Sequence, residues 1–218
     1  MGNFLPDYLA SEFIATLKQI PDGIVRRAIH VGAHAAEEAG WYRLCGIYNT
    51  LWIEANPFLF PHLEAVLAST PNQRALLALV ADTTGELRDF HVLSNGHSSS
   101  LLRPQEHLQV YPHVREITTL PLRTITLDDL LATHDEREPF NVLILDVQGA
   151  ESLVLRGAQR ALQNVQVLQT EINFRELYRG AVLAEQLDAD LQAAGFHQVA
   201  VHDTGSGWGE AIYTRGSS

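Results

Sequence analysis

Short apolar segments alternate with helix-like segments along most of this 218-residue chain, and this alternation constrains its fold more than any other feature. Residues 142–145 and 165–168 are nearly continuous apolar runs, as expected of strands buried on both faces of a parallel sheet. The predicted strands span 25–31, 50–54, 74–80, 140–146, 165–172, 196–202 and 209–214, and the predicted helices span 36–45, 57–69, 149–163 and 183–194. The alternation predicts an α/β fold with a mostly parallel sheet covered on both faces.

The last two predicted strands differ from the others in their connection. Only the segment 204–209 separates them, which is too short for a helical crossover, so we expect the pair to be antiparallel. A parallel sheet of five or so strands that ends in an antiparallel hairpin is more typical of one large group of methyltransferases than of nicotinamide dehydrogenases.

The chain length fits one domain spanning 1–218. Residues 1–24 are expected to form a helical extension at the N-terminus. The strand–helix pattern weakens over 84–133, which we interpret as an insertion that forms a lid or binds substrate. Within it, 90–93 and 117–123 resemble strands, and Thr126 caps a short helix over 126–131.

Composition excludes several classes of partner. Lys and Arg total 15 against 26 Asp and Glu, a net charge of −11, so neither nucleic acid nor an anionic membrane is expected as the main partner. No apolar run approaches the ~20 residues of a membrane span, and the first residues do not resemble a signal peptide, so we expect a cytoplasmic protein. The single cysteine, Cys45, excludes an internal disulfide framework and a zinc site built from cysteines.

Carboxylates follow the predicted strands at successive positions. In an open α/β sheet ligands bind at the carboxyl ends of the strands, where Gly32, Glu54, Asp82, Asp146 and Glu171 stand. Glu54 comes about 20 residues after the glycine turn, where a carboxylate accepts hydrogen bonds from the two hydroxyls of a ribose. This spacing indicates an adenosine-containing ligand, either NAD or S-adenosylmethionine.

The turn AIHVGAHAAEEAGWY at 28–42 favours the second ligand. A dinucleotide needs several glycines around its pyrophosphate, but Gly32 has no glycine neighbour before Gly40. Glu37 and Glu38 would repel a diphosphate. S-adenosylmethionine has no phosphate and carries a sulfonium and an ammonium, which a nearby carboxylate favours.

With these residues in place, the chain resembles the FkbM-type methyltransferases, which use S-adenosylmethionine and mostly methylate hydroxyl oxygens of sugars and related metabolites. The resemblance runs from about 28 to 214 and lies in the order of several segments. These are HVGAH with Glu37-Glu38, WIEANP at 52–57, ALVADTTG at 78–85, NGHSSSLL at 95–102, TLDDLL at 126–131, LILDVQGAE at 143–151, TEINFRELYRG at 170–180 and GWGEAIY at 207–213.

The resemblance implies a seven-stranded Rossmann-like class I methyltransferase fold and assigns site residues. Gly32, Ala33 and His34 would lie beside the methionine part of the cofactor, with Glu37 close by. Glu54 would hold the ribose, and Asn56 of the same segment is also assigned to the cofactor. Asp82 would approach the adenine amine, Ser98 and Ser99 would reach the cofactor from the insertion, and Asp146 and Gln148 would lie near the reacting methyl. Family members usually have glycine at the position of Ala36.

The expected reaction is methylation of a hydroxyl on a small molecule or glycan, with Asp146, Glu171 or His97 as the general base. A divalent metal held by His34, Asp146 and Glu171 is less favoured, because their spacing matches no known ligand signature. Two alternatives stay open: a nicotinamide-dependent oxidoreductase, and a module that binds the cofactor without catalysis.

Overall fold

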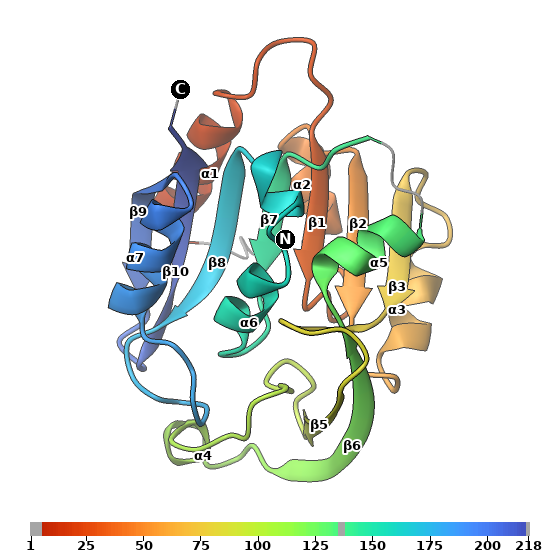
Figure 1. Cartoon of the computed structure of the whole chain (residues 1–218), viewed down its shortest axis with the longest axis vertical. Helices are drawn as coiled ribbons and strands as arrows, with labels where there is room; N and C mark the ends of the chain where they lie inside the picture. Colours follow the sequence, from red (N-terminus) through yellow and green to blue (C-terminus); the bar gives the residue numbers. More distant parts are fainter. Residues whose placement is uncertain (1–5, 135–137, 217–218) are drawn as a thin grey trace.

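A computed structural model describes residues 6–134 and 138–216 (Figure 1). A seven-stranded sheet with the order β3-β2-β1-β7-β8-β10-β9 forms its centre. The strands are β1 (Arg27–Val31), β2 (Asn49–Glu54), β3 (Gln73–Leu77), β7 (Val142–Leu145), β8 (Val167–Asn173), β9 (Phe196–Asp203) and β10 (Trp208–Arg215). Among the described helices, none has the length and apolar character needed to cross a bilayer.

Strand direction confirms the predicted fold class. β3, β2, β1, β7 and β8 pair in parallel, and β10 pairs antiparallel with both β8 and β9. Strand order reverses between β1 and β7, so the crevice outside their carboxyl ends is the expected place for a ligand.

Helices cover both faces of the sheet because successive strand residues point to opposite sides. Leu143 and Leu145 of β7 belong to a core with α5 (Leu127–Thr133), α6 (Glu151–Arg156) and α7 (Ala184–Ala193). Val142 and Ile144 belong to a second core with α1 (Asp7–Leu17), α2 (Ala39–Leu44) and α3 (Phe60–Leu67).

Several predicted elements are shorter or divided. The predicted helix 36–45 begins only at Ala39, because Ala36 has a positive φ of 55° that is incompatible with a right-handed helix. The predicted helix 57–69 spans only Phe60–Leu67. The predicted helix 149–163 ends at Arg156, and a short 3₁₀ helix, η1 (Ala161–Gln163), follows. The break falls at Gly157, where a Cβ would lie 2.2 Å from the Ala81 carbonyl oxygen.

The predicted strand 74–80 is also divided. β3 ends at Leu77, and β4 (Leu79–Val80) joins a separate three-stranded sheet of order β4-β6-β5. The strands β5 (Leu87–Leu93) and β6 (Glu116–Ile125) pair antiparallel within the segment interpreted as an insertion, which also holds α4 (His107–Val110). In Figure 1 β5, β6 and α4 lie at the bottom of the view, beyond the arrowheads of β1 and β2.

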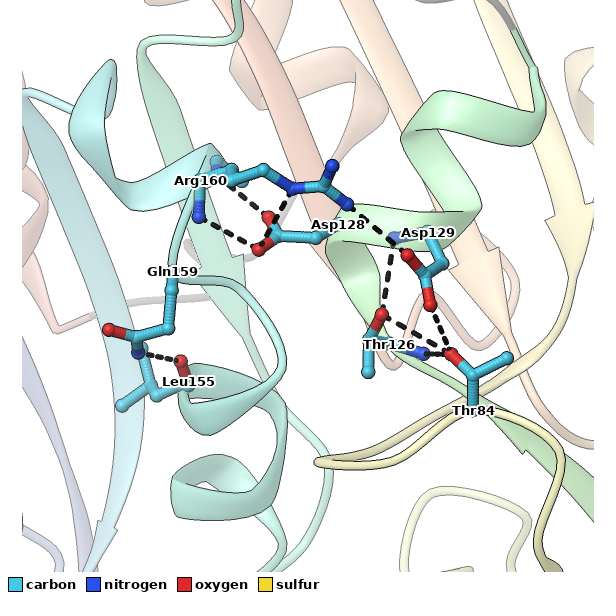
Figure 2. A network of polar contacts seen from close by, with 8 residues as sticks. Thr84, Thr126, Asp128, Asp129, Leu155, Gln159 and Arg160 are labelled. Carbon is cyan, nitrogen blue, oxygen red and sulfur yellow. Dashed lines mark hydrogen bonds and ion pairs between the residues drawn. The ribbon is translucent and has the colours of Figure 1, made fainter.

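A polar network ties the end of this segment to the sheet domain (Figure 2). The Thr126 hydroxyl accepts a hydrogen bond from the Asp129 N–H at 3.1 Å, which confirms the predicted helix cap. The Thr84 hydroxyl donates to the Asp129 carboxylate at 2.6 Å. Asp128 accepts hydrogen bonds from the backbone N–H groups of Arg160 and Ala161, both at 2.8 Å, so α5 is anchored to the loop before η1.

Candidate functional site

The turn after β1 is packed tightly against both neighbouring strands. Gly32 has a φ of +89°, and a Cβ there would lie only 1.7 Å from the Asp146 carbonyl oxygen. The N–H groups of Gly32 and Ala33 both donate to the Ile53 carbonyl, at 2.9 and 3.0 Å. Glycine is therefore required at position 32, because the turn brings β1 against the residue that follows β7.

Glu54 is fixed in place at the end of β2. One carboxylate oxygen accepts a hydrogen bond from the His34 N–H at 2.8 Å, and the other from the Asn56 N–H at 2.7 Å. The side chain is buried, and burial raises the pKa of Glu54, although these N–H donors act in the opposite direction. Each carboxylate oxygen has a second lone pair left to accept a hydrogen bond from a ligand.

A narrow cavity lies beside Glu54 and joins the turn to the insertion. Its lining includes Gly32, His34, Glu54, Phe90 and Leu101. The apolar side chains of β4, Leu79 and Val80, also line it. It encloses about 60 Å³, whereas cavities that bind small molecules usually enclose ~300 Å³ or more. Gly96, His97, Ser99 and Leu101 form the wall of this cavity on the side of the insertion.

A wide cavity of about 450 Å³ adjoins the narrow one, and His97 and Asp146 line both. Its walls combine aromatic rings with carboxyl, amide and imidazole groups. The carboxylates are those of Glu38, Asp146, Glu171 and Glu210. The shared residues place the junction of the two cavities at the carboxyl end of β7.

Gln148 connects the polar groups at this junction. Its amide nitrogen donates to the Asp146 carboxylate at 2.6 Å and to the Glu171 carboxylate at 2.7 Å. Its amide oxygen lies 3.0 Å from the Tyr178 hydroxyl, which is also 2.9 Å from the Ser98 carbonyl. Gln148 has a positive φ of 57°, so its backbone holds a strained conformation to direct this amide between the two acids.

Burial dominates the electrostatics of the wide cavity. It raises the pKa of Asp146, and burial followed by repulsion from Asp146 raises the pKa of Glu171 well above its usual range. The same causes raise the pKa of Glu210 to about 8, and burial raises that of Glu38 to about 7. A carboxyl group with a raised pKa is, when it is ionised, a stronger base than an ordinary carboxylate.

His34, Glu37 and His97 form a separate cluster. The imidazole rings of His34 and His97 stack with centroids 3.7 Å apart, and His34 Nδ1 lies 2.6 Å from Glu37 Oε1. Within residues 6–134 and 138–216, this is the group whose potential metal-ligating atoms lie within 4.8 Å of one another. The set predicted from sequence, His34 with Asp146 and Glu171, is not brought together in this way.

Other predicted site residues occupy varied positions. Ser98 lines the wide cavity and Ser99 the narrow one, where its hydroxyl accepts a hydrogen bond from the Leu93 N–H. Ala33 is buried in the core beneath the turn, and Asn56 caps the chain after β2 by accepting from the Phe58 N–H. Asp82 lies outside both linings and forms ion pairs with Arg88 at 2.9 Å and Arg156 at 3.6 Å.

Glu210 and Gln169 also line the wide cavity, and no role was predicted for either from the sequence. A signal was present for Glu210, because it stands among apolar residues in the buried strand WGEAIYTR. A charged side chain inside such a strand needs a partner or a function. Pairing of β10 with β8 places Glu210 directly opposite Glu171, which the sequence pattern does not reveal.

Comparisons with known proteins agree with this architecture. The model of the methyltransferase FkbM domain family matches residues 30–197. The curated 2-O-methyltransferase NoeI of Sinorhizobium fredii (strain NBRC 101917 / NGR234) is 27% identical over 176 residues, covering 77% of this chain and 70% of that protein.

Solved structures show the same fold at low sequence identity. The METTL16 methyltransferase domain superposes with a TM-score of 0.58 at 10% identity, covering 99% of this chain and 71% of that one. A protein of the NADB-Rossmann superfamily from Streptococcus agalactiae gives a TM-score of 0.52 at 14% identity, covering 100% and 72%. The family match, the strand order and the paired cavities lead to one conclusion: the chain belongs to the FkbM family of S-adenosylmethionine-dependent methyltransferases.

Proposed function

We propose that this methyltransferase transfers the methyl group to a hydroxyl oxygen of a sugar or a small polyhydroxylated metabolite. The observation that carries the proposal is the pair of carboxylates, half-buried Asp146 and buried Glu171, that Gln148 holds beside the junction of the two cavities. An alcohol is a weak nucleophile, so its methylation benefits from a base that removes the proton during attack. The curated relative NoeI, named a 2-O-methyltransferase, supports oxygen as the acceptor atom.

Different residues of this chain would bind the cofactor and the acceptor. S-adenosylmethionine supplies a methyl group that its sulfonium already activates. Glu54 would bind the ribose hydroxyls. The turn at Gly32 would allow the cofactor to approach the protein backbone closely. Asp82, Asn56, Ser98 and Ser99 remain proposed cofactor contacts, as do Ala33, His34 and Glu37 beside the methionine part.

In the wide cavity, the acceptor oxygen would form the new O–C bond as the C–S bond breaks. Its proton would pass to Asp146 or Glu171, with His97 as the third candidate base. Positioning of oxygen, carbon and sulfur in line contributes much of the rate, up to roughly 7–11 kcal/mol in ideal cases. Aromatic side chains of Trp41, Tyr111 and Trp208 line the same cavity and offer surfaces for the apolar faces of a sugar ring.

The test is methyl transfer from labelled S-adenosylmethionine to a panel of monosaccharides and cyclitols, with NMR of the product to locate the methyl group. We expect an O-methyl product. Asp146→Asn and Glu171→Gln preserve side-chain shape, and the variant that removes the base should lower kcat by about 10²–10⁴-fold. Methylation at nitrogen or carbon, or full turnover in both variants, would contradict the proposal.

A further inference from the structure

The wide cavity contains more carboxyl groups than proton removal requires. Besides Asp146 and Glu171, its lining includes Glu38 and Glu210, and no lysine or arginine is among the described residues that line it. Glu171 and Glu210 occupy directly opposed positions on β8 and β10. Like charges in that position destabilise a sheet, and burial increases the cost, so folding alone does not account for this pair.

Two side chains that line the same cavity have hydrogen-bonding atoms without a partner among the described residues. The Gln169 amide nitrogen donates to Glu210 at 3.3 Å, while its amide oxygen has no partner among the described residues, although the side chain is only 7% exposed. His30, 3% exposed, contacts Tyr42 through Nδ1 and leaves Nε2 without a partner there. The Gln169 oxygen can only accept hydrogen bonds, so a ligand that satisfies it must bring a donor.

A bare metal ion does not match this arrangement. Among the described residues, the cluster with ligand atoms gathered within 4.8 Å is His34, Glu37 and His97, and none of the four cavity carboxylates belongs to it. Acidic groups that are spread along a cavity wall beside an acceptor amide suit an organic cation with several N–H donors.

We infer that the acceptor carries a protonated amine, as an amino sugar or an aminocyclitol does, and that Glu171, Glu210 and the Gln169 carbonyl bind this ammonium, which leaves Asp146 as the candidate base among the carboxylates. The inference rests on the proposed function and narrows its substrate class. An ammonium would neutralise the opposed carboxylates and supply donors to the unpartnered oxygen. The same lining would repel phosphorylated and carboxylated acceptors.

Calorimetry on the protein saturated with S-adenosylhomocysteine tests this assignment. The probes are glucosamine and 2-deoxystreptamine, each with its N-acetylated form as the neutral counterpart, and glucose 6-phosphate as the anion. We expect the amines to bind roughly tenfold tighter or more than the acetylated forms, as a charge-assisted hydrogen bond contributes, and the phosphate not to bind. Equal or tighter binding of the acetylated forms, or no binding of either amine, would overturn the inference.

Glu210→Gln tests the role of Glu210 in binding the amine, since it keeps the side-chain shape and removes repulsion from Glu171. It should abolish most of the preference for the amine and leave the affinity for S-adenosylhomocysteine unchanged. Glu64→Gln, on the exposed surface of α3, is the matched control and should change neither. An amine preference that survives in Glu210→Gln would contradict the role of that residue. Failure to bind S-adenosylhomocysteine would refute the proposed function itself, whereas O-methylation restricted to neutral sugars would refute only this inference.

Discussion

Ala36 adopts a backbone conformation that favours glycine. Its φ is +55°, in the left-handed region that costs a residue with a Cβ about 1–2 kcal/mol. The side chain is nevertheless 3% exposed and packs in the core beneath the turn, so the methyl group does not enter either cavity lining. This explains why glycine suits the position and why alanine leaves the cavities open.

Substitution by glycine measures that strain. Ala33 and Ala36 are both buried, but Ala33 is not among the described residues with positive φ. Ala33→Gly and Ala36→Gly each remove a buried methyl and add the same freedom to the unfolded chain. We expect Ala36→Gly to be about 1–2 kcal/mol less destabilising than Ala33→Gly in urea unfolding, because only Ala36→Gly relieves the strain. Equal losses would show that the backbone at 36 is unstrained.

The secondary-structure features that depend on the local sequence pattern were predicted well. The strands around 142–145 and 167–172, the final antiparallel hairpin and the Thr126 cap follow from apolar runs, loop length and cap chemistry. Helix ends were predicted poorly where tertiary contact decides them. Gly157 interrupts a helical pattern because the chain passes against Ala81, a residue distant in sequence.

The cap of α5 provides a test at this scale. Thr126 accepts a hydrogen bond from the Asp129 N–H, whereas Thr133 at the other end of the helix is exposed and donates to the Asp129 carbonyl at 2.8 Å. Thr126→Ala should lower the free energy of unfolding by about 1 kcal/mol, and Thr133→Ala should have little effect. Thermal unfolding of both variants checks this. If the Thr126 cap contributes no stability, Thr126→Ala and Thr133→Ala will have the same melting temperature.

For the whole molecule, the sequence indicated the edge of the sheet at which the site lies, but not its full composition. Gly32, Glu54, Asp146 and Glu171 were identified because each follows a predicted strand. Glu210 was not, since its place in the cavity depends on the register between β8 and β10. The ion pairs of Asp82 were equally hidden, because they join it to Arg88 and Arg156, which come from separate elements.

The buried acids also predict how stability depends on pH. Glu210 is repelled by Asp146, Glu151 and Glu38, lies opposite Glu171 and accepts a hydrogen bond from Gln169. Burial raises the pKa of Glu210 to about 8 and that of Glu38 to about 7, so the folded protein binds protons that the unfolded chain has released. This stabilisation is complete below the unfolded pKa near 4.5 and is lost as pH rises through 7 and 8.

We therefore expect the free energy of unfolding of the ligand-free protein to fall between about pH 6.5 and pH 8, by up to about 1.4 kcal/mol per pH unit for each group, and to level off above the folded pKa values. Burial lowers the pKa of His30 to about 3, an effect of opposite sign that operates only below the unfolded histidine pKa of about 6.5. Glu210→Gln should reduce the slope and Glu64→Gln should not, as measured by urea unfolding across this range. A flat or rising profile would contradict the protonated state of the cluster.

The turn at Gly32 and the carboxylate of Glu54 are expected to bind S-adenosylmethionine rather than a dinucleotide. Titration calorimetry with S-adenosylhomocysteine and with NAD, on the wild-type protein, Glu54→Gln and the Glu64→Gln control, distinguishes the two ligands. Wild type should bind S-adenosylhomocysteine and not NAD, Glu54→Gln should lose about 1–3 kcal/mol of that affinity, and the control should lose none. Binding of NAD, or an unchanged affinity in Glu54→Gln, would contradict this expectation.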